Sequence, residues 1–316
     1  MRVLICQPVT DNMRRRFEES FPDHEFIYDE NPDKEAFRHA EVLFGFPDPD
    51  MIQYCEKLRF VQLASSGAEK HNATVPMDVP LCSTTGVFGR EIAEVMLGYV
   101  LSLNKYLPQY RDRQSKKLWD PRYFNRPVLG LNVLILGLGD IGMNFARLMK
   151  ALDCHVIGLR RTEGAKPDCA DELYTMDALD SLIPNADIIA MCLPSTPETQ
   201  NVMSRQRIFA MKEGSILINV GRGSAADNLA LCDALKDGPL FGAAIDVIDE
   251  EPLPESHPAW DAENLIITPH VAGRSISPWL IEQCGEVFIR NFGAFLENRP
   301  FETLVDRETG YMVSRR

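Results

Sequence analysis

Residues 132–142, near the middle of the chain, read NVLILGLGDIG. Residues 133–136 form a short apolar run of the kind found in parallel strands that are buried on both faces. The run ends directly in the pattern Gly-x-Gly-x-x-Gly, formed by Gly137, Gly139 and Gly142. Beyond it, apolar residues recur at the spacing of an amphipathic helix: Ile141, Phe145, Leu148, Met149 and Leu152. The stretch therefore predicts a strand, a tight turn and a helix in succession.

In this setting each glycine has a physical role. Gly137 permits the tight turn, Gly139 lets a pyrophosphate approach the backbone, and Gly142 lets the helix and the strand pack closely. The helix then begins at Asp140 and Ile141, where free N–H groups and a partial positive charge attract phosphate oxygens. We therefore predict a dinucleotide-binding site, with an ordinary strand–helix turn as the alternative interpretation.

Composition and charge limit the class of protein. The chain has 316 residues, which is enough for two domains that each bury a core. Its 45% of hydrophobic and 25% of charged residues are typical of soluble globular proteins. The formal net charge is −13 without any dense Lys/Arg block, so we expect no nucleic-acid partner. No leader pattern and no apolar run of about 18 residues is visible, so we expect no membrane partner either.

Cysteine and histidine usage bears on the compartment and on metals. The eight cysteines form no Cys-x-x-Cys pair, which fits a reducing cytoplasm better than a disulfide framework. The six histidines form no cluster with the spacing of a metal site. We expect a cytoplasmic protein without a bound metal.

Strand-like runs on both sides of the glycine pattern predict two α/β domains. Three runs precede it and alternate with helix-compatible stretches: Val3–Cys6, Val42–Phe44 and Phe60–Leu63. Five runs follow it: His155–Leu159, Ile188–Cys192, Ile216–Val220, Ala243–Val247 and Leu265–Thr268. Together with residues 133–136, the later runs reach the strand count of a doubly wound dinucleotide-binding sheet.

The order of these runs predicts a discontinuous layout. Long amphipathic helices are expected near residues 92–103 and 280–295, before and after the second group of strands. Residues 106–125 are polar and aromatic without a clear period, which is typical of an arm or linker. We infer that a dinucleotide-binding domain, residues 101–273, is inserted into a second domain made of residues 1–100 and 274–316.

Three ionisable residues lie at or just beyond predicted strand ends. They are Arg222, Glu251 and His270. Ligands of open α/β sheets bind outside the carboxyl ends of the strands, so these three side chains are expected near one cleft. Taken singly, each also fits a solvated or structural role, since most ionisable groups are of that kind.

Taken together with the glycine pattern, the sequence resembles the D-isomer-specific 2-hydroxyacid dehydrogenases. The matching segments are GLGDIG at 137–142, LP at 193–194 with TPET at 196–199, INVGRG at 218–223, AIDV at 244–247, EPLP at 251–254 and TPHVAG at 268–273. The resemblance covers nearly the whole chain, through VDRETGY at 305–311. It implies two doubly wound parallel-sheet domains of the α/β class, a Rossmann cofactor domain inserted into a flavodoxin-like substrate domain.

The resemblance also implies a reaction: hydride transfer between a nicotinamide cofactor and C2 of a small 2-keto or 2-hydroxy acid. His270 would give a proton to the developing alkoxide, as an imidazolium can near neutral pH. Glu251 would stabilise that imidazolium. Arg222 would bind the substrate carboxylate and carbonyl oxygen through its planar fork of donors, and so position C2 for hydride attack.

Further contacts are implied for both ligands. A turn at Ser66, Gly67 and Ala68 would offer a nest of N–H groups to the substrate carboxylate, with an ordinary small-residue turn as the alternative. It lacks the Gly-x-Gly-x-Asp form frequent in relatives, which leaves the choice of 2-keto acid open. The cofactor would contact Leu193, Pro194, Thr199, Val220, Gly221, Asp246, Ala272 and Gly273, with Asp246 holding the nicotinamide amide.

The end of the second strand after the glycine pattern bears on cofactor choice. Enzymes that use NAD usually carry Asp or Glu there, about 20 residues past the glycines, to bind the ribose 2′-hydroxyl. This chain has Arg160, Arg161 and Thr162 instead. A carboxylate would repel a 2′-phosphate, whereas guanidinium groups and a hydroxyl attract it. We predict a preference for NADPH with NAD possible; the alternative is that the arginines are solvated and Glu163 binds the ribose.

The leading function is thus an NADPH-dependent 2-keto acid reductase, with glyoxylate and hydroxypyruvate as plausible substrates. A formate- or phosphite-type dehydrogenase on the same fold, and a corepressor-like protein that senses NAD(P), are the alternatives. Apolar and aromatic surface on the arm (residues 106–125) and on the expected helix at residues 92–103, together with the family resemblance, predicts a homodimer built there, with Trp119 near the interface.

Overall fold

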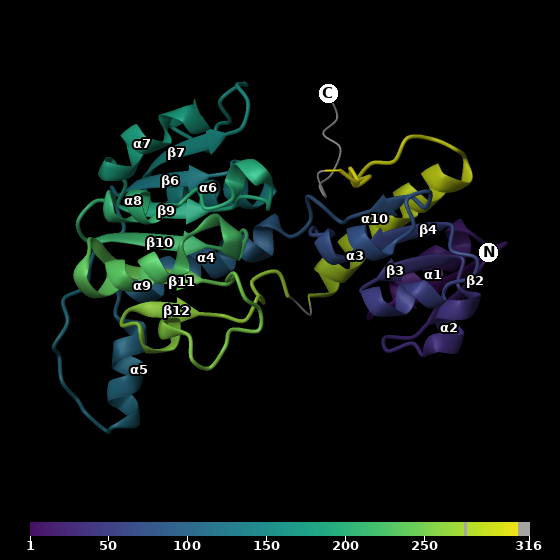
Figure 1. Cartoon of the computed structure of the whole chain (residues 1–316), viewed down its shortest axis with the longest axis horizontal. Helices are drawn as coiled ribbons and strands as arrows, with labels where there is room; N and C mark the ends of the chain where they lie inside the picture. The colour runs from purple at the N-terminus through teal and green to yellow at the C-terminus, as the bar shows by residue number, and fades with distance from the viewer. Residues whose placement is uncertain (275–276, 309–316) are drawn as a thin grey trace. The chain divides into compact units, whose positions relative to one another are not determined.

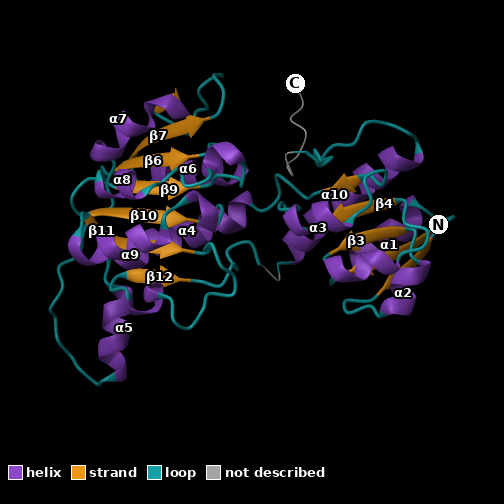
Figure 2. Ribbon diagram, viewed as in Figure 1, coloured by secondary structure: helices purple, strands orange, loops and turns teal. Residues whose placement is uncertain are grey.

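The computed structural model describes residues 1–274 and 277–308 and divides the chain into two compact units (Figure 1). Unit 1 combines Met1–Phe88 with Ser275–Arg316, and unit 2 is the continuous segment Gly89–Arg274. Each unit is built on one parallel sheet with helices around it (Figure 2). Within the described ranges, no helix has the length and apolar character needed to cross a membrane.

Unit 1 contains a five-stranded parallel sheet in the order β2-β1-β3-β4-β5. Its strands are β1 (Arg2–Cys6), β2 (Glu25–Tyr28), β3 (Val42–Gly45), β4 (Phe60–Leu63) and β5 (Leu81–Cys82). Its helices are α1 (Asp11–Ser20), α2 (Lys34–His39), α3 (Glu69–Thr74) and α10 (Pro278–Leu296), with the 3-10 helix η1 (Pro49–Tyr54). Phe288 of α10 stacks on Phe44 of β3 with 4.6 Å between ring centroids. Helix α10, which follows unit 2 in the sequence, therefore packs on the strands that begin the chain.

Unit 2 contains a seven-stranded parallel sheet in the order β12-β11-β10-β9-β6-β7-β8. Its strands are β6 (Asn132–Leu136), β7 (His155–Arg160), β8 (Glu172–Thr175), β9 (Ile188–Met191), β10 (Ser215–Asn219), β11 (Leu240–Ile245) and β12 (Leu265–Ile267). Its helices are α4 (Gly89–Asn104), α5 (Leu107–Ser115), α6 (Asp140–Ala151), α7 (Leu179–Leu182), α8 (Arg205–Phe209) and α9 (Asn228–Asp237). Its 3-10 helices are η2 (Met176–Ala178), η3 (Ile183–Asn185), η4 (Pro197–Thr199), η5 (Gly223–Ala225) and η6 (Pro258–Asp261).

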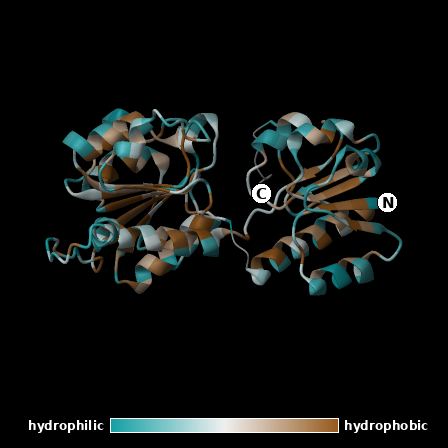
Figure 3. Ribbon diagram, turned by 90° about the horizontal axis from the view of Figure 1, so that it is seen from below, coloured by the Kyte–Doolittle hydropathy of each residue, from teal (hydrophilic) through white to brown (hydrophobic). Residues whose placement is uncertain are grey.

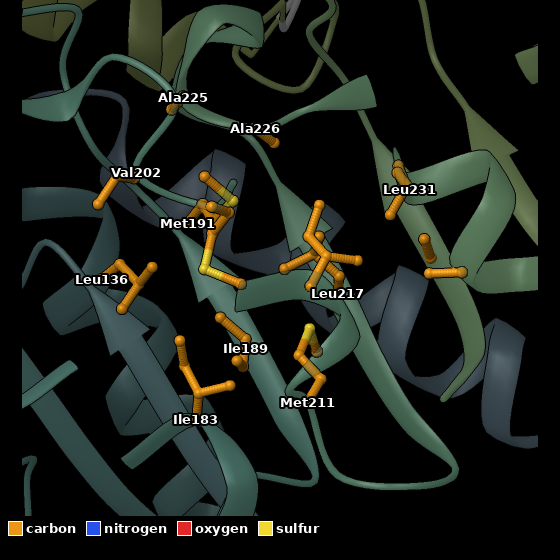
Figure 4. Packing of buried hydrophobic residues seen from close by; sticks show 14 of the residues in the cluster. Leu136, Ile183, Ile189, Met191, Val202, Met211, Leu217, Ala225, Ala226 and Leu231 are labelled. Atoms are coloured by element: carbon orange, nitrogen blue, oxygen red, sulfur yellow. The ribbon is translucent and has the colours of Figure 1, made fainter. Parts of the chain in front are cut away.

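Alternation along the strands of unit 2 divides its core into two layers, one on each face of the sheet (Figure 3). In β6, Val133 and Ile135 belong to the layer that includes α4 and α6. Leu134 and Leu136 belong to the other layer, part of which is seen in Figure 4. Because both faces are covered by apolar side chains, the strands read in the sequence as continuous apolar runs.

The glycine turn lies at the topological switch point of this sheet. From β6 the strands proceed outward to β7 and β8, and the chain then returns to β9 on the other side of β6. All the strands are parallel, so their carboxyl ends lie along one edge. Ligands of open α/β sheets bind at this edge, beside the switch point.

The predicted α/β class with two parallel sheets is confirmed, and every predicted strand is present. The sequence pattern does not reveal β2, β5 and β8. β5 has only two residues, and β2 and β8 are partly exposed, so none forms a continuous buried apolar run.

The structure differs from the expectation at two segments. Residues 106–125 are not wholly irregular, because Leu107–Ser115 forms α5, which projects from unit 2 (Figure 1). The predicted domain boundary after residue 100 falls inside α4. That helix packs against α6, so unit 2 begins at Gly89. The resemblance to the dehydrogenase family extends through VDRETGY at 305–311, and the last three of these residues, 309–311, lie outside the described residues.

Candidate active site

The turn between β6 and α6 is shaped by its glycines. Gly137 has a φ of 94°, and a Cβ there would lie 2.8 Å from the carbonyl oxygen of Cys192. A Cβ at Gly142 would collide with the carbonyl oxygen of Gly137, so the helix approaches the strand this closely only without a side chain. Gly139 differs, because no described atom lies within 4 Å of a Cβ built there. The backbone at Gly139 is thus open to a ligand, while the turn around it is tightly packed.

The start of α6 keeps its N–H groups available. The N-cap residue is Gly139, so no capping side chain accepts a hydrogen bond from the first turn of the helix. The carboxylate of Asp140 is used elsewhere: Oδ2 accepts from the N–H of Gly89 at 2.8 Å and Oδ1 from Nδ2 of Asn144 at 3.1 Å. Ile141 packs against the core layer of α4. The arrangement leaves the helix N-terminus suited to an anion.

Arg160 ends β7, and Arg161 and Thr162 follow in an exposed turn. The Arg160 guanidinium lies beside Met143, with Nη2 4.0 Å from Sδ, and its Nη1 donates to the carbonyl of Ala165 at 3.4 Å. Its Nε is buried and has no hydrogen-bond partner among the described residues. This strand end therefore carries a buried donor that still needs an acceptor.

The loops after β9 and β10 carry the next predicted cofactor contacts. Leu193 is buried beyond the end of β9, and Thr199 holds the loop by donating to the carbonyl of Pro194 at 2.6 Å. Val220 and Gly221 are buried beyond the end of β10. These five residues, Pro194 included, therefore lie at the carboxyl edge of the sheet, in the loops after two strands that follow the switch point.

Arg222 is half-buried in the loop that follows β10. Its Nη1 donates to the carbonyl of Gly221 at 2.7 Å. The buried side chain of Asn219 closes the loop, because Nδ2 donates to the carbonyl of Arg222 at 3.0 Å and Oδ1 accepts from Gly221 at 3.1 Å. The loop backbone from which Arg222 extends is thus fixed by a side chain of the strand itself.

Glu251 and His270 are in direct contact. Oε2 of Glu251 lies 2.8 Å from Nδ1 of His270. The other carboxylate oxygen, Oε1, accepts from the backbone N–H of Ile248 at 3.2 Å, which orients the group. The side chain of His270 is 52% exposed, so the imidazole is accessible. The two predicted partners therefore form a pair, in the loops after the neighbouring strands β11 and β12.

Asp246, just beyond β11, holds the turn that carries His270. Its carbonyl oxygen accepts from the N–H of His270 at 2.8 Å. Asp246 is buried, with 4% of its surface exposed. Its carboxylate accepts from the N–H groups of Val271 and Ala272 at 2.9 Å each. These bonds keep His270 at a φ of 54°, a left-handed conformation that is uncommon outside glycine. The Asp246 carboxylate thus has a structural task in addition to its predicted contact with the nicotinamide amide. Gly273 follows in the same turn.

A cavity of about 410 Å³ in unit 2 adjoins the Glu251–His270 pair. Its lining adds the apolar side chains of Leu253, Trp260 and Ile267. Apolar walls around a few polar groups are typical of small-molecule sites. Sequence reasoning missed Trp260, because η6 brings it to the cavity and no strand-end signal marks it. Within the described ranges, no group of three or more His, Cys, Asp or Glu side chains is placed to hold a metal ion.

The predicted substrate turn, Ser66, Gly67 and Ala68, belongs to unit 1, between β4 and α3. Ser65 Oγ donates to the carbonyl of Gly67 at 2.7 Å, and Ser66 Oγ donates to that of Thr84 at 3.3 Å. The turn is therefore ordered by its own hydroxyl groups. The residues predicted for catalysis and for cofactor binding lie along one edge of the sheet of unit 2. The predicted substrate turn is part of unit 1.

Residues 97–272 match the family described as D-isomer specific 2-hydroxyacid dehydrogenase, NAD binding domain. The chain belongs to this family. It is 31% identical to the glyoxylate reductase of Thermofilum pendens, over 71% of this chain and 67% of that protein. It is 29% identical to glyoxylate/hydroxypyruvate reductase B of Pectobacterium carotovorum, over 85% of this chain and 87% of that protein. The crystal structure of a D-isomer specific 2-hydroxyacid dehydrogenase family protein from Aeromonas salmonicida matches with a TM-score of 0.86 at 29% identity, covering 97% and 99% of the two chains.

Membership confirms the resemblance seen in the sequence. The protein is an NAD(P)-dependent oxidoreductase of a family that acts on small 2-hydroxy and 2-keto acids. Three observations in unit 2 fit a dinucleotide: the open space at Gly139, the N-terminus of α6 without a side-chain cap, and the buried, unpartnered Nε of Arg160. The matched segment contains all three of them and the Glu251–His270 pair.

Proposed function

We propose that the protein uses NADPH to reduce a small 2-keto acid to a D-2-hydroxy acid. The observation that carries the proposal is the 2.8 Å contact between Glu251 Oε2 and His270 Nδ1. Because a carboxylate only accepts hydrogen bonds, Nδ1 donates to Glu251 and Nε2 is left for the substrate. In the imidazolium form Nε2 also carries a proton, and this is the proton that the pair would transfer at the sheet edge that carries the glycine turn.

Each residue of the site has one task in this reaction. The cofactor, when bound at the glycine turn, supplies the hydride that reduces the keto carbon. His270 donates the proton that neutralises the developing alkoxide, and Glu251 stabilises the imidazolium before transfer. Arg222 binds the substrate carboxylate and the keto oxygen through its planar fork of donors, which positions C2 for hydride attack. The N–H groups of residues 66–68, in unit 1, remain a predicted anion-binding nest whose contribution is tested by substitution.

Glyoxylate and hydroxypyruvate are the substrates we propose to test first. Relatives with about 30% identity are named glyoxylate reductase and glyoxylate/hydroxypyruvate reductase. The Gly-x-Gly-x-Asp form common in relatives is absent at residues 65–70, so 2-keto acids with larger side chains are tested beside these two.

The preference for NADPH rests on the end of β7. A ribose 2′-phosphate carries about −1.5 to −2 charges near neutral pH, and Arg160, Arg161 and Thr162 supply two positive charges and a hydroxyl. The buried Nε of Arg160 gains an acceptor when a phosphate oxygen binds there. We assign the remaining cofactor contacts to Leu193, Pro194, Thr199, Val220, Gly221, Asp246, Ala272 and Gly273, all at strand ends of unit 2.

We also propose that the protein is a cytoplasmic homodimer. All eight cysteines are free, which suits a reducing compartment. On the arm after α5, Trp119 is 100% exposed and Phe124 89% exposed, which is more aromatic surface than a monomer usually presents. A second copy that covers this arm buries both rings. Sedimentation of a monomer at micromolar concentration would contradict the dimer.

One assay tests the function. Purified protein is mixed with NADPH and, in separate reactions, with glyoxylate, hydroxypyruvate, pyruvate and larger 2-keto acids, and cofactor oxidation is followed. Formate and phosphite are tested in the opposite direction with NADP. We expect turnover with at least one small 2-keto acid. Oxidation of formate or phosphite alone, or cofactor binding without any turnover, would replace the reductase by one of the alternative functions.

A further inference from the structure

The turn that carries His270 is tied to a side chain far away in the sequence. Oγ1 of Thr268 lies 2.6 Å from Oδ1 of Asp246 and 2.5 Å from the phenol oxygen of Tyr99. Tyr99 belongs to α4 and is 6% exposed. A continuous chain of hydrogen bonds therefore runs from α4, through Thr268, to the carboxylate that accepts the N–H groups of Val271 and Ala272.

The direction of these hydrogen bonds follows from counting protons. The carboxylate of Asp246 only accepts, so the hydroxyl of Thr268 donates to it. The single proton of Thr268 is then used, and Tyr99 is the donor to Thr268. Burial, and to a lesser degree the charge of Asp246, raise the pKa of Tyr99. The phenol therefore keeps its proton, and acts as a donor, throughout the neutral range.

The turn needs support from outside its own strand. β12 has only three residues and lies at the edge of the sheet, where β11 is its neighbour. The turn that follows holds His270 at a φ of 54°, which a residue with a side chain adopts only where its surroundings impose it. Asp246 imposes it directly, and the two hydroxyl groups fix where the Asp246 carboxylate sits.

We propose that Tyr99 is a positioning residue for catalysis, which acts through Thr268 and Asp246 to fix the turn that aims His270 at the substrate. The inference rests on the proposed role of His270 as the proton donor. An acid–base group displaced by about 1 Å can lose about 10²-fold in rate, so the hydroxyl of a buried tyrosine outside the cavity can govern turnover. A tyrosine that only fills the core would contribute to stability and leave the reaction step unchanged.

Tyr99→Phe removes the hydroxyl and keeps the ring. We expect kcat for 2-keto acid reduction to fall about tenfold or more. The deuterium isotope effect on kcat, measured with NADPH labelled at the transferred hydrogen, should rise because the chemical step becomes slower. Thr268→Val should behave in the same way, and Thr268→Ser, which keeps a hydroxyl, should stay close to the wild type.

A matched control is Tyr28→Phe. Tyr28 is a half-buried tyrosine of unit 1 whose phenol oxygen lies 3.4 Å from Glu18 Oε1. It should retain the wild-type kcat and isotope effect. If Tyr99→Phe lowers the unfolding temperature but keeps both kinetic values, Tyr99 is a core residue only and the proposal is overturned.

Hydrogen exchange gives a readout that does not depend on the reaction. In Tyr99→Phe and Thr268→Val, the amides of Val271 and Ala272 should exchange faster than in the wild type, because the acceptor that protects them is less well fixed. If the wild type reduces no 2-keto acid, the proposed function fails, and this exchange still decides the role of Tyr99 in the turn. Unchanged exchange at both amides in both variants contradicts the proposal.

Discussion

Two turns at the same edge of unit 2 hold left-handed backbone by opposite means. After the central strand β6, Gly137 adopts a φ of 94° because it has no side chain. After the edge strand β12, His270 adopts a φ of 54° although it has one, and the carboxylate and carbonyl of Asp246 hold it there. The first turn depends on its glycines, because a side chain at these positions would not fit. The second depends on groups that only the folded sheet brings together, so only the first appears as a sequence pattern.

Removal of the imidazole tests the function of the histidine turn. His270→Ala should lower kcat by about 10²–10⁴, the usual scale for losing a positioned acid–base group. NADPH affinity should barely change, because the glycine turn lies on another strand. Steady-state rates and a fluorescence titration of NADPH check both statements. Near-normal turnover of His270→Ala would remove the proposed mechanism.

A pair of alanine substitutions tests the glycine turn. At Gly139 a methyl meets no described atom and φ is −86°, so Gly139→Ala should fold normally. We propose that the pyrophosphate approaches the backbone here, so loss of one charge-assisted bond of about 1.5–3 kcal/mol should weaken cofactor binding about 10–160-fold. Gly142→Ala should instead lower the unfolding temperature, since its methyl meets the carbonyl of Gly137. Thermal unfolding and cofactor titration separate the two, and equal behaviour of the variants would argue against our account of the turn.

The end of β7 lies beside the glycine turn and should set the choice of cofactor. We expect the wild type to prefer NADPH over NADH by about 10²-fold, about 2.7 kcal/mol, and the preference should weaken as salt rises. Arg160→Asp should reduce or reverse it, because a carboxylate repels the 2′-phosphate and accepts from a 2′-hydroxyl.

The control for charge alone is Arg147→Asp, an exposed position on α6 whose guanidinium bonds Asn144. It should keep the NADPH preference. Equal kcat/KM for the two cofactors in the wild type at low salt would show that Arg160 and Arg161 are solvated charges, and the assignment to NADPH would be withdrawn.

The smallest expected effect concerns the partner of the histidine. In the proposed reaction Glu251 orients the imidazole through its 2.8 Å contact with Nδ1 of His270. Glu251→Gln removes the carboxylate charge beside the proton donor, so kcat should fall, but less than in His270→Ala, and NADPH affinity should be kept. Steady-state rates measure this, with the exposed neighbour in Glu250→Gln as the control. An unchanged kcat in Glu251→Gln would contradict the role of Glu251.

The comparison of the two turns also explains what the sequence can predict. The glycine turn, the continuous apolar strands and the strand-end positions of Arg222, Glu251 and His270 follow from local patterns, and the structure has them at the expected places. Tyr99 and Trp260 carry no such local signal, because their neighbours in the fold are far away in the sequence. β8 was missed for a related reason: it is partly exposed and has no continuous apolar run.

The position of α4 could not be predicted from its own amphipathic pattern either. That pattern shows which face is buried and does not show which sheet covers it. Packing against α6 assigns the helix to unit 2.

The central claim is that a hydride passes from NADPH to C2 of a 2-keto acid, and one labelling experiment tests it directly. The protein is incubated with hydroxypyruvate and NADPH deuterated at the transferable position, and the product is examined by mass spectrometry and by separation of enantiomers. We predict glycerate of the D configuration that carries one deuterium at C2. Unlabelled product, product of the L configuration, or no reduction of any 2-keto acid in the panel would contradict the account.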